Sequence, residues 1–464
     1  MSTSHKLIAP GLLLFIDSLL VAAGNWIFWL VISKFTLVSE VGQATTIYSL
    51  VALIATSIQL GLEYPLLKQA YTQKSQILAT ALAVELILSI ATLPILLYTI
   101  TFFDKSAQDF LWLAIGLLFS SAIGFVTRYI LLGISDVRSV LLIDVVGNCL
   151  KFVMGYALVL GGNGASAILM SFLSYNAFVA GTSLVILLRR IGFELKRSQI
   201  KFAIELTKAG LINTPFKLSK VFIITLSIIL LTPFGISNAD IGIFYISLMI
   251  SVIAGSLASS IAFMVIPAST KIGNDLSSIG IRIGLSLTAP IISALLVAPK
   301  FILSTIGTQY VTGDMVLLIL AVSIFPNSIA FNAISAFNNN GEYRKIIVIG
   351  SVEFLTFFTA FWFLVPIGGI TGAAVSVLLA FVAACIPSII WLKGTLSRYV
   401  STSIAAIIVG VTLSYILGLV TGMHPLVLII VSFVVTSIII ITLKNIRLVE
   451  IKEIVGVVTK TKEL

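Results

Sequence analysis

The stretch that decides the fold is ALVLGGNGAS, residues 157–166, which has a counterpart 208 positions later in VPIGGITGAA, residues 365–374. Three residues recur at the same spacing: Gly161, Gly164 and Ala165 correspond to Gly369, Gly372 and Ala373. In both places an apolar run precedes the glycines and another follows them. Because glycine permits tight turns, we interpret the pattern as a duplicated unit in which two helices are joined by a short turn.

Composition places these helices in a membrane. Of the 464 residues, 59% are hydrophobic and 10% are charged, and the mean hydropathy is +1.17, a balance that water-soluble domains do not reach. A helix needs about 20 apolar residues to cross a hydrocarbon core of about 30 Å. We predict an all-α polytopic membrane protein of about 14 such runs, at 11–33, 42–64, 77–101, 110–132, 140–161, 165–188, 208–232, 241–267, 282–306, 314–337, 345–366, 370–392, 401–421 and 425–443.

The net charge of +10 is interpreted as a topology signal and not as a sign of nucleic-acid binding. If the N-terminus is cytoplasmic, most of the 28 Lys and Arg residues fall on the cytoplasmic side of the predicted spans. This bias predicts a multi-pass protein of the cell (plasma or inner) membrane with both termini in the cytoplasm. It also predicts contacts with membrane lipids and no nucleic-acid partner.

The repeat predicts the organisation of the chain. Gly42 and Gly242 extend it at a displacement of 200 residues. We expect a first six-helix lobe at 1–188, a basic cytoplasmic linker at 189–207, a second six-helix lobe at 208–392, two additional helices at 393–443 and a cytoplasmic tail at 444–464.

Lysines inside the predicted spans are the first candidate site. An ionisable group deep in a bilayer costs at least about 2.5 kcal/mol, so it must face protein or water. Asn213, Lys217 and Lys220 share one helix face near mid-membrane, and Lys151 lies at a similar depth. These residues are predicted to bind an anionic head group such as a phosphate. For Lys151 the alternative of an ion pair with a neighbouring carboxylate remains open.

Acidic and amide side chains in the first half form the second candidate site. Asp17, Asp144 and Asn148 lie in predicted spans and are candidates for binding a coupling proton or sodium ion, with an interhelical polar pair as the alternative. The chain shows no Walker A loop, HExxH motif or nucleophile elbow. We therefore predict no catalytic residues, no resident metal and no cofactor other than a coupling H⁺ or Na⁺.

A family resemblance adds to this interpretation. FTLVSEVG at 35–42, YSL at 48–50 and QLGLE at 59–63 resemble the second-helix region of polysaccharide flippases, and the turn at 365–374 is similar to a Gly-Ala-Ala turn of the same proteins. Ser39 and Gln59 depart from the usual proline and aspartate of the family. The chain is identified as a member of the multidrug/oligosaccharidyl-lipid/polysaccharide (MOP) exporter superfamily, in its O-antigen-type polysaccharide-flippase branch.

The resemblance implies two pseudo-symmetric six-helix lobes around a central cavity that opens alternately to each side. Its implied function is that of a flippase, which moves a lipid-linked phosphate or pyrophosphate oligosaccharide to the outer leaflet without breaking a bond. A glycan polymerase or glycosyltransferases of the same pathway are the implied protein partners. Two alternatives are a cation-coupled multidrug antiporter of the same superfamily and a membrane glycan ligase or polymerase, the latter disfavoured by the tiny external loops.

Overall fold

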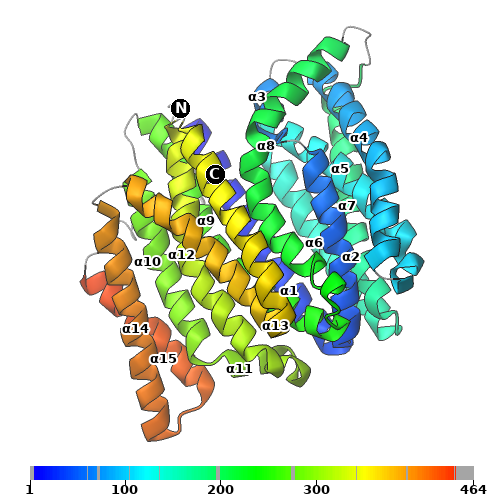
Figure 1. The fold of residues 1–464 in the computed structure, drawn as a ribbon. Helices are drawn as coiled ribbons and strands as arrows, with labels where there is room; N and C mark the ends of the chain where they lie inside the picture. Colours follow the sequence, from blue (N-terminus) through cyan, green and yellow to red (C-terminus); the bar gives the residue numbers. More distant parts are fainter. Residues whose placement is uncertain are drawn as a thin grey trace. The chain divides into compact units, whose positions relative to one another are not determined.

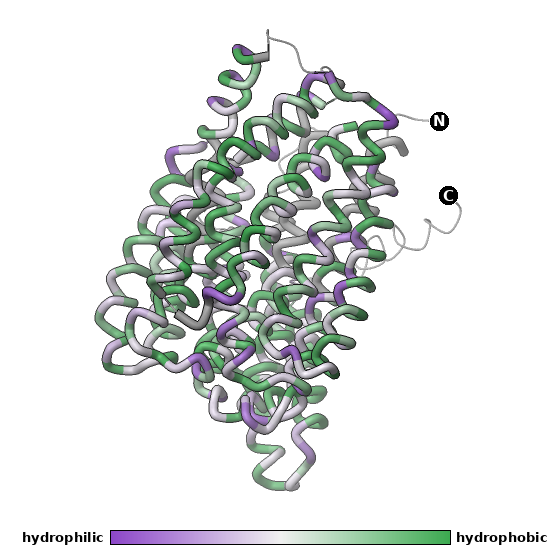
Figure 2. Tube along the Cα trace, turned by 90° about the vertical axis from the view of Figure 1, so that its right-hand side faces the viewer, coloured by the Kyte–Doolittle hydropathy of each residue, from purple (hydrophilic) through white to green (hydrophobic). Residues whose placement is uncertain are grey.

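The computed structural model describes residues 5–59, 61–70, 74–103, 105–134, 136–194, 199–272, 277–340, 342–392, 395–443 and 445. Within these ranges every regular element is a helix, so the predicted all-α fold class is confirmed. The helices are hydrophobic along most of their length (Figure 2). The chain divides into two compact units, one of Ile16–Tyr245 and one of Met1–Phe15 with Ile246–Leu464, and each is described by itself.

The unit Ile16–Tyr245 contains most of α1 and all helices up to the start of α9 (Figure 1). α7 packs against α5 and α6, while α8 packs against α2, α3 and α4. Leu62, Leu66 and Leu131 belong to its fully buried hydrophobic core. The elements are α1 (His5–Phe35), α2 (Val38–Ile58), α3 (Glu63–Gln69), α4 (Lys74–Phe103), η1 (Lys105–Phe110), α5 (Leu111–Gly133), α6 (Val137–Leu160), α7 (Gly164–Arg190), α8 (Gln199–Ile229), η2 (Thr232–Phe234) and α9 (Asn238–Ile272).

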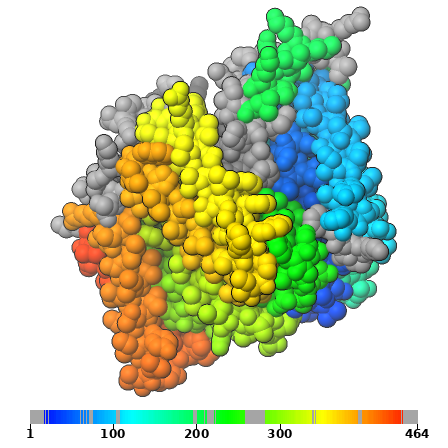
Figure 3. All heavy atoms as spheres, viewed as in Figure 1, coloured from blue at the N-terminus to red at the C-terminus, as the bar shows by residue number. Residues whose placement is uncertain are grey.

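The other unit takes α9 onward from Ile246. α12 packs against α10 and α13, and α14 and α15 pack against α10 and against each other. Figure 3 shows α14, in orange, on the molecular surface, where many of its large hydrophobic side chains are exposed. The elements are α10 (Ser277–Val297), α11 (Pro299–Ile306), η3 (Thr308–Gly313), α12 (Asp314–Asn339), α13 (Tyr343–Leu392), α14 (Thr395–Thr421) and α15 (Pro425–Thr442).

Every predicted span overlaps a described helix. By length and composition, 10 helices of the described residues could cross a membrane, or up to 11 if the bent pair α10 and α11 counts as one span. α13 alone covers two predicted spans, 345–366 and 370–392. The number of 14 spans and the predicted lobe boundaries stay predictions.

Two helix ends differ from the predicted spans. α2 ends at Ile58 and not at residue 64, because the chain turns at Gly61, whose φ is 63°, before the short α3 begins. The predicted span 282–306 is broken, since α10 and α11 meet at an angle of 82°. Pro299 begins α11, and proline has no N–H to continue the hydrogen bonding of the preceding helix.

The glycine turns of the repeat are confirmed. Gly162 and Gly164, with φ of 78° and 44°, connect α6 to α7. Gly369, with φ of 53° and ψ of −133°, interrupts the helical conformation inside α13. Positive φ is disfavoured for any residue with a Cβ atom, which explains why glycine occupies these positions.

The two glycines at a displacement of 200 residues contact each other. A Cβ atom on Gly42 would lie 1.7 Å from the carbonyl oxygen of Asn238, and one on Gly242 would lie 2.3 Å from the carbonyl oxygen of Val38. α2 and the start of α9 therefore cross backbone against backbone. Sequence comparison identifies these glycines as equivalents, but it does not predict that they meet.

Candidate functional site

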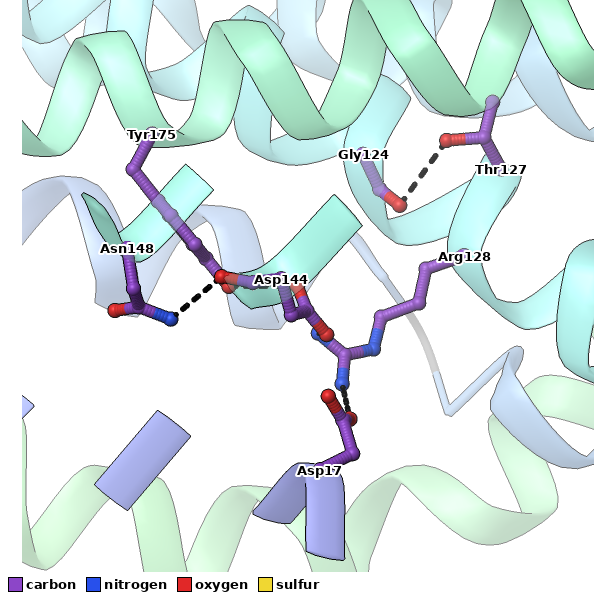
Figure 4. A network of polar contacts seen from close by, with 7 residues as sticks. All are labelled: Asp17, Gly124, Thr127, Arg128, Asp144, Asn148 and Tyr175. Atoms are coloured by element: carbon purple, nitrogen blue, oxygen red, sulfur yellow. Dashed lines mark hydrogen bonds and ion pairs between the residues drawn. The ribbon is translucent and has the colours of Figure 1, made fainter. Parts of the chain in front are cut away.

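A buried polar cluster joins four helices of the unit Ile16–Tyr245. Asp17 comes from α1, Arg128 from α5, Asp144 from α6 and Tyr175 from α7 (Figure 4). The four side chains lie within segments that are otherwise apolar. Because an unpaired charge is costly in a bilayer, the convergence of these side chains pairs the two carboxylates with a cation.

Arg128 bridges the two carboxylates. Its Nη2 lies 2.8 Å from Asp17 Oδ2 and its Nη1 lies 2.8 Å from Asp144 Oδ2. Asp17 and Asp144 are each only 1% exposed. The planar guanidinium presents its N–H groups in a fixed fork, so one arginine can hold two carboxylates from different helices.

Tyr175 and Asn148 complete the surroundings of Asp144. The hydroxyl of Tyr175 donates to Asp144 Oδ1 at 2.9 Å. Asn148 donates its Nδ2 to the backbone carbonyl of Asp144, also at 2.9 Å, one turn earlier on α6 (Figure 4). The predicted trio of Asp17, Asp144 and Asn148 is thus brought together, with a guanidinium between the two carboxylates. Its role in binding a coupling ion stays a prediction.

Lys151 is held by neutral groups. It is 2% exposed and donates to the amide oxygens of Asn25 and Asn148, the latter at 2.8 Å. Its Nζ also lies 5.2 Å, 5.4 Å and 5.3 Å from the ring centroids of Phe28, Phe172 and Tyr175. Amide oxygens and ring faces both stabilise an ammonium group without cancelling its charge. Among the described contacts of Lys151 there is no carboxylate, since Arg128 takes both.

The other predicted site residues lie on α8. The backbone of this helix is described, but the side chains of Asn213, Lys217 and Lys220 lie outside the described residues. Their predicted role in binding substrate, and that of Lys151, stays a prediction.

Sequence analysis missed Arg128 and Tyr175. Arg128 lies near the end of the predicted span 110–132. In the charge count it is therefore assigned to the basic residues of the cytoplasmic side. A sequence signal for Arg128 does exist. Two aspartates inside predicted spans require a cation nearby, and Arg128 is the one arginine inside a predicted span of residues 1–188. Tyr175 gives no such signal, because tyrosine is common in apolar segments.

Comparisons with known proteins identify the fold. No protein-family model matches the sequence, and no curated protein matches it. Among solved structures, the lipid II flippase MurJ in an inward-closed conformation matches with a TM-score of 0.73 and 10% identity, over 93% of this chain and 98% of that chain. An inward-facing multidrug resistance MATE family transporter of the MOP superfamily matches with a TM-score of 0.59 and 18% identity, over 83% and 96%.

A third match is a MOP superfamily transporter from Pyrococcus furiosus, with a TM-score of 0.53 and 16% identity, over 84% of this chain and 96% of that chain. The fold implied by the family resemblance is therefore confirmed: the chain has the fold of the MOP superfamily transporters. Together with its many apolar helices, this fold makes it a multi-pass membrane protein.

Proposed function

We propose that this protein is a lipid flippase that moves a lipid-linked phosphate or pyrophosphate oligosaccharide from the cytoplasmic to the outer leaflet by alternating access. The observation that carries the proposal is the fold similarity to a lipid II flippase over 93% of the chain, which exceeds the 83% covered by the MATE transporter.

The chemistry of the charged residues supports the same cargo. The Nζ of Lys151 donates to two neutral amide oxygens, and the sequence places Lys217 and Lys220 on one face of α8. A phosphate group is the ligand that such ammonium groups bind as point charges. Movement of a head group across a membrane needs no bond to break, in keeping with a sequence that lacks catalytic motifs.

The test is a leaflet-exposure assay. Purified protein is reconstituted into liposomes with a fluorescent lipid-linked sugar phosphate, and a membrane-impermeant quencher measures how fast the label becomes accessible. We expect the double variant Lys217→Gln/Lys220→Gln to lose most of this rate. Lys300→Gln is the control, because the Lys300 side chain is 73% exposed. Wild-type rates in the double variant would refute the proposed role of the two lysines.

A second candidate is a cation-coupled multidrug antiporter, favoured by the MATE structures among the matches and by the buried acidic pair Asp17 and Asp144. It predicts export of cationic dyes from cells that is lost on Asp17→Asn. Dye export of this kind, without lipid movement in liposomes, would replace the flippase proposal.

A further inference from the structure

Arg128 supplies the positive charge between two buried carboxylates. Its guanidinium lies between Asp17 on α1 and Asp144 on α6 and touches one oxygen of each at 2.8 Å. Two buried carboxylates that share a site repel each other, and a positive charge between them offsets that repulsion. Here the chain itself supplies that charge.

The carboxylates retain oxygens that hydrogen bonds do not satisfy. Asp17 Oδ1 is buried and has no hydrogen-bond partner among the described residues, and Asp144 Oδ2 has the ion pair with Arg128 as its contact. Figure 4 shows both carboxylates close to the guanidinium. Clustered carboxylate oxygens are the ligands that hard inorganic cations bind. If the guanidinium were removed, the remaining oxygens would form such a ligand set.

The charge balance indicates the class of cation. Arg128 places one positive charge between the two carboxylates. Removal of its guanidinium therefore takes one positive charge from the cluster. A monovalent cation replaces that charge, whereas a divalent cation would exceed it.

We propose that Arg128 is the resident cation of a latent sodium site and excludes inorganic cations from the Asp17–Asp144 pair in the wild-type protein. Arg128 thus determines ion specificity in this half of the chain. The Arg128 side chain is 30% exposed, whereas the two carboxylates that it joins are 2% exposed. This inference does not depend on the cargo, since it concerns ion binding alone.

The test compares thermal unfolding of the purified full-length protein in sodium chloride and in choline chloride at equal concentration. A ligand that binds only the folded state raises the melting temperature as its concentration increases. We expect Arg128→Met to gain a saturating, sodium-dependent rise in melting temperature. The double variant Arg128→Met/Asp144→Asn loses that rise, because its charge deficit is removed. Lys300→Met is the control and behaves as the wild type.

Two results would overturn the proposal: equal melting temperatures of Arg128→Met in the two salts, or a sodium response of the wild-type protein that Asp144→Asn abolishes. Arg128→Gln is the second variant if Arg128→Met does not fold. Recovery of either variant from sodium but not from choline supports the proposal. If neither folds in either salt, the wild-type comparison with Asp144→Asn decides.

Discussion

Two polar clusters hold helices together in this molecule by different means. Around Arg128, the buried carboxylates Asp17 and Asp144 are joined by an interhelical ion-pair bridge through the part-buried guanidinium. Between α10 and α15, the hydroxyls of Thr436 and Ser293 hydrogen-bond at 2.9 Å, and Ser293 also donates to the backbone carbonyl of Ser432 at 3.3 Å. A hydroxyl enters a bilayer helix at little cost, whereas a charge costs at least about 2.5 kcal/mol. The charged cluster therefore depends on its ion pairs more than the hydroxyl cluster of Ser293 and Thr436 depends on its hydrogen bonds.

The charged cluster has no counterpart in the second half of the repeat. At a displacement of 208 residues, the positions of the charged cluster are occupied by apolar or small residues: Arg128, Asp144, Lys151 and Tyr175 correspond to Ala336, Val352, Thr359 and Ala383. Both halves have a glycine with positive φ in this region, Gly162 and Gly164 in the first and Gly369 in the second, but the charges do not recur. The comparison teaches that the Arg128 cluster has no charged counterpart at these four positions.

The largest expected effect tests the charged cluster. Arg128→Met leaves two carboxylates, each 1% exposed, without their shared cation. We expect the free energy of unfolding in choline chloride to fall by about 3 kcal/mol, as measured by denaturant titration in mixed micelles. If Arg128→Met lowered the free energy of unfolding no more than Thr436→Val does, the charged cluster and the hydroxyl cluster would not differ in their contribution to stability.

The next effect tests how tightly the hydroxyl cluster is packed. A Cβ atom on Gly410 would lie 2.0 Å from Thr436 Oγ1 and 3.3 Å from the carbonyl oxygen of Ser432. Gly410→Ala therefore forces Thr436 away from its hydrogen bonds, and we expect a loss of about 2 kcal/mol in the same titration. Gly181→Ala is the control, because nothing lies within 4 Å of a Cβ at that position. Equal stability of the two variants would contradict close packing here.

A smaller effect is expected for the hydroxyl of Tyr175. Tyr175→Phe keeps the ring beside Lys151 and removes the donor to Asp144 Oδ1. A hydrogen bond to a charged group contributes about 1.5 kcal/mol or more, which the titration resolves. Tyr415→Phe, on an exposed tyrosine of α14, serves as the reference. If the two substitutions had the same effect, Tyr175 would not be part of the charged network.

The smallest effect is expected for Thr436→Val. This substitution keeps the shape of the side chain and removes its hydrogen bond to Ser293. Hydrogen bonds between membrane helices average about 0.6 kcal/mol, so the loss should be close to that value. Ser437→Ala, which removes a hydrogen bond within α15 itself, is the matched control. If Thr436→Val lowered the free energy of unfolding as much as Arg128→Met does, hydroxyls and charges would contribute equally to helix association in this protein.

The sequence predicts the positions of the helices better than it predicts the residues of the charged cluster. Apolar runs and glycine turns are local signals, so they predict where helices lie and where the chain reverses. Asp17, Asp144 and Lys151 are conspicuous in apolar runs and were predicted as site residues for that reason. Their partners are not conspicuous, because pairing depends on which helices meet. Arg128 sits near the end of its span, where basic residues usually belong to the membrane surface.

The crossing of α2 and α9 has a mechanical consequence. Neither Gly42 nor Gly242 has a side chain that could shift to fill a partial gap between the two backbones. Any larger residue at either position acts as a wedge, and a single methyl group is enough to hold the two helix ends apart.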